Sequence, residues 1–82
     1  MAQIGKYDAL RDRLAGAPTP LELTFDAIDA LVGGLPSSAL IHRAWWANEE
    51  HGQHVQARAW REANRRVESV DLVRRRVTFG PR

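Results

Sequence analysis

The 82-residue sequence contains no cysteine and only one lysine, Lys6. The lack of cysteine excludes a disulfide framework and a thiolate metal site, so packing alone must hold the chain together. It also fits a reducing compartment, and we expect a cytoplasmic protein. Because lysine is scarce, eleven of the twelve basic residues are arginine, whose planar guanidinium suits bidentate contacts with phosphates and base edges. A GC-rich genome would produce the same bias.

Long apolar runs are also missing, and none approaches the roughly 20 residues that span a bilayer. The first residues show no basic region followed by an apolar stretch, which is the pattern of a secretory signal. We therefore expect a protein that is neither exported nor membrane-embedded. Three Trp, two Phe and the aliphatic residues suffice for a single small core.

Acidic and basic side chains are unevenly distributed along the chain. Residues 1–57 contain four basic and seven acidic residues, a net charge of −3, whereas residues 58–82 contain eight basic and three acidic residues, a net charge of +5. This asymmetry favours an anionic partner for the C-terminal part. It indicates the charge of that partner and not its chemistry.

Hydrophobic periodicity predicts an α+β domain of four short helices followed by a C-terminal β-hairpin. A first helix over 4–15 ends at a proline-rich link, and Thr24 is the expected N-cap of a second helix that ends at Gly33. A short extended segment precedes Thr24. We expect one domain, in which residues 1–20 form the N-terminal helix and link, 21–66 a helical core and 67–80 the hairpin. The predicted shared core contains Phe25, Ile28, Trp60 and Phe79.

A third helix is predicted to start at Ser37, its expected N-cap, and to end at Trp45. The second helix, a glycine turn and this third helix outline a helix-turn-helix. The outline is imperfect. If Gly33 is the turn glycine, Asp29 falls where a small residue is usual, and if Gly34 is the turn glycine, it falls where an apolar residue is usual. With the hairpin as a wing, the order of elements resembles that of a winged helix.

The adjacent Trp45 and Trp46 cannot face the same way. One is expected to seal the core, and the other to pack under the fourth helix or lie partly exposed; core packing is favoured over a base-stacking platform.

A basic face is predicted on the fourth helix, which begins near Gln53. Counted from His54, its residues at i, i+4, i+7 and i+11 are basic, and they lie opposite an apolar stripe that includes Trp60. After Asn64, a tolerable left-handed C-cap, apolar and polar residues alternate as in a β-strand. The bend at residues 73–75 is rich in arginine. The predicted nucleic-acid-binding residues of helix and hairpin are His54, Arg58, Arg61, Arg65, Arg66, Arg74, Arg75 and Arg76.

This pattern favours a small module that binds duplex DNA, as in bacterial or phage transcription regulators, and a homodimer, because one module offers few contacts. The helix arginines would position or read DNA, and those of the hairpin would contact phosphates. Two alternatives remain. The basic face is a solvated surface with pairs such as Arg58 to Glu62, or the domain is an adaptor or phage-encoded inhibitor that binds a host protein through a Trp and Arg surface.

No residue set indicates catalysis, a metal site or a cofactor. Glu50, His51 and His54 lack a further convergent ligand, and Ser37 and Ser38 are explained as helix caps. Neither a nucleophile elbow nor a phosphate-binding glycine loop is present. We therefore predict a protein that is not an enzyme.

Several short motifs resemble those of a family of small, uncharacterised bacterial and bacteriophage domains. The resemblance covers about two-thirds of the chain. Members of that family tend to have Gly-Trp before the hairpin, where this chain has Asn64-Arg65, so an aromatic contact is replaced by a positive charge. The resemblance implies a shared fold without an activity. The motifs are LTF at 23–25, LPSSA at 35–39, WWAN at 45–48, HVQARAW at 54–60 and VTF at 77–79.

Overall fold

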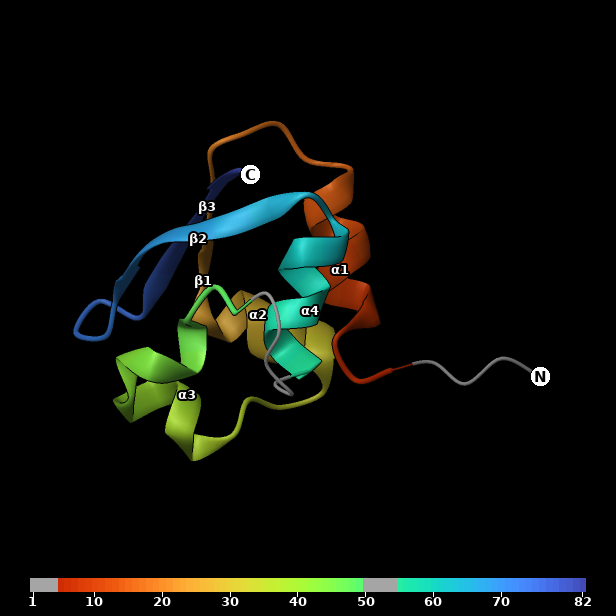
Figure 1. Cartoon of the computed structure of the whole chain (residues 1–82). Coiled ribbons are helices and arrows are strands. Elements are labelled where there is room, and N and C mark those ends of the chain that lie inside the picture. Colours follow the sequence, from red (N-terminus) through yellow and green to blue (C-terminus); the bar gives the residue numbers. More distant parts are fainter. Residues whose placement is uncertain (1–4, 50–54) are drawn as a thin grey trace.

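The computed structural model of the chain describes residues 5–49 and 55–82. Helices and a small antiparallel sheet confirm the predicted α+β class (Figure 1). None of the helices in the described ranges is long and apolar enough to cross a membrane. In chain order the elements are α1 (Asp8–Ala15), β1 (Leu21–Thr24), α2 (Phe25–Val32), α3 (Ser37–Ile41), the 3₁₀ helix η1 (Arg43–Trp46), α4 (Val55–Glu62), β2 (Arg65–Asp71) and β3 (Arg76–Pro81).

The sheet has three strands in the order β1-β3-β2, and both outer strands pair with β3 in antiparallel fashion. The extended segment before Thr24 therefore becomes a strand, with Leu23 opposite Val77. The C-terminal hairpin is confirmed, but β2 begins at Arg65 and not at residue 67. The hairpin thus starts directly after the turn that ends α4.

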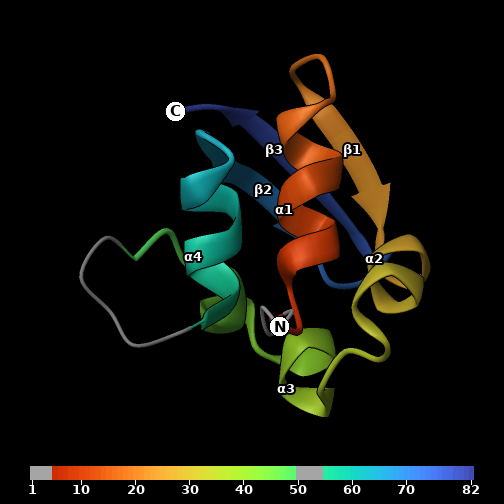
Figure 2. The same ribbon diagram turned by 90° about the vertical axis from the view of Figure 1, so that its right-hand side faces the viewer.

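One face of the sheet is covered by the helices, and Figure 2 shows α1 and α4 in front of the strands. Strand alternation explains this packing, because Val77 and Phe79 of β3 are buried while Arg76 is exposed and Thr78 is half-buried. A bulge between Val67 and Ser69 places two exposed residues between the buried valines of β2. The opposite face of the sheet is consequently polar.

The turn between α2 and α3 explains the aspartate that did not fit the helix-turn-helix outline. Thr24 Oγ1 accepts a hydrogen bond from the Ala27 N–H at 3.1 Å, which confirms the predicted N-cap. At the other end of α2, Gly33 adopts a left-handed conformation with φ of 74°. Asp29 Oδ1 then accepts from the Leu35 N–H at 2.6 Å, so this carboxylate holds the turn in place.

Helix α3 is shorter than predicted, because it ends at Ile41 and the chain continues into η1. The N-cap position belongs to Pro36, and the prediction of Ser37 as N-cap was wrong. Five residues make little more than one turn, too short for a typical recognition helix. The structure therefore does not confirm a winged helix or a helix-turn-helix.

The core is a cluster of aromatic rings between the helices and the sheet. Trp46 stacks on Phe25 with ring centroids 5.1 Å apart and on Trp60 at 6.0 Å, while Trp60 also contacts Phe79 at 5.8 Å. Phe25, Ile28, Trp60 and Phe79 are all at least 99% buried, as predicted. Of the two adjacent tryptophans, Trp46 is buried and the half-buried Trp45 packs against the edge of the cluster.

Candidate functional site

Helix α4 presents fewer free arginines than its sequence predicts. Its buried face, which includes Ala59 and Trp60, packs against the core, and the helix ends at Glu62. Asn64 then adopts a left-handed conformation with φ of 62°, as predicted, and reverses the chain. Arg65 therefore lies on β2, so its assignment to the helical stripe was wrong. His54 lies outside the described residues.

Arg58 is neutralised within its own helix. Its Nε donates to Glu62 Oε2 at 2.9 Å, four residues along α4, and Arg11 of α1 lies 3.5 Å from the other oxygen of the same carboxylate. The hydrogen bond from Arg58 holds the pKa of Glu62 below its ordinary value. The intrahelical pair considered in the sequence is thus present.

Arg61 and Arg65 bind backbone carbonyls of the protein. Arg61 Nη1 donates to the Glu49 carbonyl at 3.0 Å. Arg65 Nη2 donates to the Ala17 carbonyl at 3.0 Å, and its Nη1 donates to the Ala63 carbonyl at 3.3 Å near the end of α4. These two arginines therefore join segments that are distant in the sequence.

The hairpin tip, defined here as residues 72–75, is held at both ends by hydrogen bonds. Asp71 Oδ1 accepts from the N–H groups of Val73 at 3.0 Å and Arg74 at 2.9 Å. On the return side, the carbonyl of Arg75 accepts from the Phe25 N–H at 2.9 Å. Arg75 itself adopts a left-handed conformation, with φ of 57°. The tip is consequently an ordered turn.

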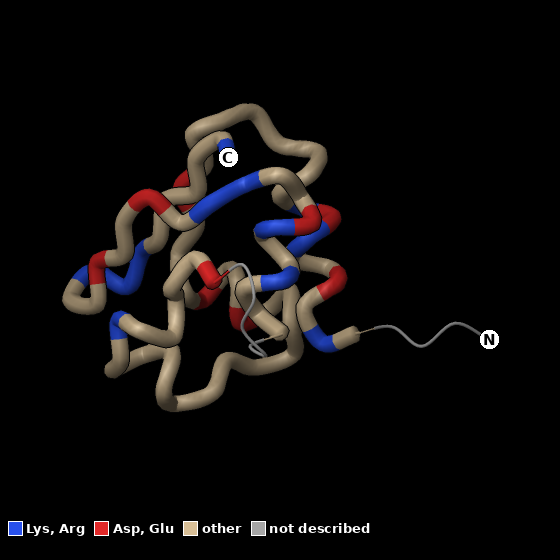
Figure 3. The backbone as a smooth tube through the Cα atoms, viewed as in Figure 1, with Lys and Arg blue, Asp and Glu red and all other residues tan. Residues whose placement is uncertain are grey.

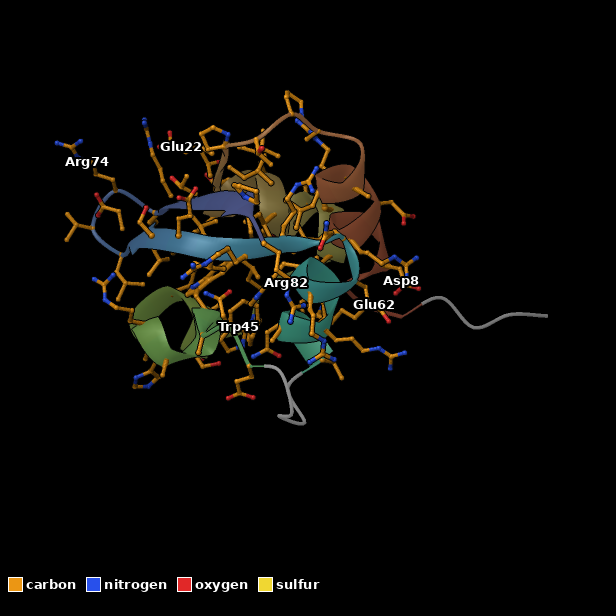
Figure 4. The ribbon with its side chains drawn as sticks, turned by 45° about the horizontal axis from the view of Figure 1, so that its top comes forward. Asp8, Glu22, Trp45, Glu62, Arg74 and Arg82 are labelled. Carbon is orange, nitrogen blue, oxygen red and sulfur yellow. The ribbon has the colours of Figure 1, made fainter. Side chains whose placement is uncertain are left out.

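The arginine side chains of the tip are available for a ligand. Within the described residues, the guanidinium groups of Arg74 and Arg75 have neither a hydrogen bond nor an ion pair, and both side chains are exposed. Arg74 points away from the body of the molecule (Figure 4). Arg76, the next residue, pairs instead with Glu22 of β1 at 3.2 Å.

Arg43 of η1 was not predicted as a site residue. Its Nη1 donates to the carbonyl of Val70, close to the hairpin tip, so the tertiary structure adds this exposed arginine to that end of the molecule. Figure 3 shows basic residues gathered there. Arg43 is the only arginine between residues 14 and 57, and no local pattern marks it as a site residue.

A family model described as "Domain of unknown function (DUF7662)" matches residues 7–81. The chain belongs to this family. No curated protein and no solved structure matches the chain. The match confirms the expectation, drawn from the short motifs, of an uncharacterised family. The bacterial or phage origin stays a prediction.

In this DUF7662 domain the predicted site residues form two groups at opposite ends of β2. Arg61, Arg65 and Arg66 lie where the strand begins, and the tip arginines follow its end. Strand β2 is seven residues, or about 20 Å, long, and its acidic residues Glu68 and Asp71 lie between the two groups (Figure 3). They do not form one continuous basic surface. Within the described ranges, no three His, Asp or Glu side chains converge as metal ligands.

Proposed function

We propose that this domain binds duplex DNA by contacting phosphates with its hairpin tip. The observation that carries the proposal is the pair of guanidinium groups on Arg74 and Arg75, which have no partner within the described residues and stand on a turn with ordered backbone. Arginine forms bidentate, charge-assisted hydrogen bonds with phosphate oxygens. A turn that is already ordered has less conformational entropy to lose on binding.

The backbone of Arg75 supports a role for its side chain. A left-handed conformation favours glycine or asparagine, and other residues hold it at a cost of about 1 kcal/mol or more. A residue whose only role was to turn the chain would serve better as glycine. Arginine at this position therefore suggests that the guanidinium group itself is used.

The helical element beside the DNA in this proposal is α3 with η1, and not α4. Arg43 of η1 is attached to β2 at the Val70 carbonyl, next to the tip, and its side chain is exposed. Arg58 and Arg61 of α4 would first have to exchange their internal partners for phosphates, which reduces the net gain. Arg43 likewise has an internal partner, the Val70 carbonyl, so within the described residues only Arg74 and Arg75 offer unpartnered guanidinium groups at this end. Two such groups per chain are few, so we propose a homodimer on DNA.

The experiment is a titration of a mixed-sequence duplex at two or more salt concentrations. Each phosphate contact contributes about −0.9 to the slope of log affinity against log salt. Arg74→Ala should therefore flatten the slope by roughly one unit and weaken all sequences alike. Arg75→Asn should do the same without disturbing the turn, because asparagine tolerates the left-handed conformation.

Arg13→Ala is the matched control, since Arg13 is exposed on α1 and has no partner within the described residues. It removes the same charge from a different part of the surface and should leave the slope unchanged. Equal effects of Arg13→Ala and Arg74→Ala would indicate unspecific charge attraction. No binding even at low salt would refute the DNA proposal.

A second candidate is protein recognition through the same end of the molecule. Val73 at the tip is 93% exposed and Ile41 at the end of α3 is 65% exposed, so apolar side chains accompany the arginines. An interface anchored by such residues should be much less sensitive to salt than a phosphate interface. If the unaltered domain binds a purified protein partner and no detectable DNA, and the Val73→Ser variant no longer binds that partner, this candidate would be favoured.

A further inference from the structure

A second candidate site lies at the other end of β2, where a cavity of about 300 Å³ opens between α4, the start of β2 and the C-terminal residue. Four arginines belong to its wall, and Figure 4 shows Arg82 beside the strand and the helix. Its volume is at the lower end of the range of small-molecule pockets. The lining residues are Asn48, Glu49, Ala57, Trp60, Arg61, Arg65, Arg66 and Arg82.

The shape of this pocket is fixed by hydrogen bonds around it. Asn48 donates to the Val67 carbonyl and accepts from the Val67 N–H, both at 2.8 Å, so the segment before residue 50 is attached to the edge of β2. Arg61 and Arg65 are held by backbone carbonyls on either side. The pocket wall is therefore built before any ligand arrives, which lowers the entropy cost of binding.

The charge of the wall is strongly positive. The lining residues include four arginines and one acidic residue, Glu49, which gives a formal net charge of +3 among their side chains. Arg66 is exposed, and its guanidinium has no partner within the described residues. A dianionic group offsets more of this charge than a monoanionic carboxylate does.

Trp60, one of the lining residues, carries a polar group in an unusual environment. It is 99% buried, and its Nε1–H is a buried donor without an acceptor among the described residues. Trp46 provides the contrast, because its Nε1 donates to the Ala39 carbonyl at 2.9 Å. A buried donor without a partner is uncommon in proteins, and its resonance is a sensitive reporter of changes at the pocket wall.

We propose that this pocket binds a small molecule carrying a phosphate monoester. The guanidinium groups, Arg66 foremost, would hold the phosphate oxygens. A nucleotide and a sugar phosphate share this chemistry. The proposal does not rest on DNA binding, since the pocket lies at the end of β2 opposite the hairpin tip.

The test uses the full chain labelled with ¹⁵N and titrated with adenosine 5′-monophosphate, ribose 5-phosphate, inorganic phosphate and adenosine. Saturable binding of at least one phosphate monoester, with a shift of the Trp60 indole N–H resonance, is the expected result. Adenosine should bind at least about tenfold more weakly than its monophosphate, because it lacks the charge-assisted hydrogen bonds. A preference for the nucleotide over ribose 5-phosphate would identify the base as part of the ligand.

Arg66→Ala should weaken phosphate monoester binding by about tenfold or more and leave the fold intact, since Arg66 has no side-chain partner within the described residues. Arg13→Ala and Arg74→Ala are the matched controls and should bind the ligand as the unaltered chain does. Three results would each overturn the proposal: no saturable binding of either monoester, binding of adenosine as tight as that of its monophosphate, or binding unaffected by Arg66→Ala. Loss of DNA binding in Arg74→Ala with ligand binding retained would separate the two sites.

Discussion

The two buried tryptophans differ in one hydrogen bond, and this difference predicts unequal effects of the same substitution. Trp46 and Trp60 are each 1% exposed and stack on each other. Trp46 Nε1 donates to the Ala39 carbonyl, whereas Trp60 Nε1 has no acceptor among the described residues. Replacing each by phenylalanine keeps an aromatic ring and removes the N–H group.

The size of the difference follows from the two environments. Replacing a buried indole by the smaller phenyl ring should destabilise the fold by about 1–2 kcal/mol, a fraction of the cost of removing the whole ring. Trp46→Phe also leaves the Ala39 carbonyl unpaired, which adds about 1–3 kcal/mol. Trp60→Phe removes an unpaired donor and recovers a similar amount, so its net effect should be near zero. We therefore expect Trp46→Phe to be the more destabilising by about 3 kcal/mol.

Urea denaturation followed by far-ultraviolet circular dichroism measures this difference. A chain of this size has a total stability of about 4–12 kcal/mol, so a loss of 3 kcal/mol is well resolved. With a slope of about 1–2 kcal/mol per molar urea, the two midpoints should differ by roughly 2 M. Equal destabilisation by the two substitutions would show that the Trp60 N–H is hydrogen-bonded in the folded protein, and our reasoning about both residues would then be wrong.

Three further predictions concern stability. Asn48→Ala removes both hydrogen bonds to the Val67 backbone and should destabilise the fold by about 1–3 kcal/mol in the same urea assay; no change would show that β2 does not depend on this contact. Gly33→Ala places a side chain in a left-handed conformation, with open space around it, and should lower the stability by about 1–2 kcal/mol, whereas Gly33→Asn should lose less. The pKa of Glu62 is lowered from its ordinary value of 4.5 by the hydrogen bond from Arg58, so the pair should stabilise the fold above pH 4.5 and lose this effect as the pH falls through the folded-state value. Glu62→Gln should accordingly weaken the acid-induced loss of stability in melts between pH 3 and pH 7, and an unchanged pH profile would refute this assignment.

Local signals in the sequence determined most of the secondary structure. Thr24 caps α2 because its hydroxyl reaches an N–H three residues along, and Gly33 and Asn64 end helices because both tolerate a left-handed backbone. The alternation of Val77 and Phe79 with more polar residues made β3 recognisable as a strand. These interactions extend over a few residues, so composition and spacing suffice to detect them.

Only the tertiary structure decided which arginines are available to a ligand. Arg65 donates to the Ala17 carbonyl, 48 residues away, and Arg61 to that of Glu49, whereas Arg74 has no such partner in the part of the chain that the structure describes. In the sequence all three are alike, because an exposed arginine and one that bridges two segments have the same local pattern. Whether a guanidinium group is free depends on which carbonyls and carboxylates the fold brings to it, and those come from parts of the chain that meet only when β1 and β2 pair with β3 and the helices cover the sheet.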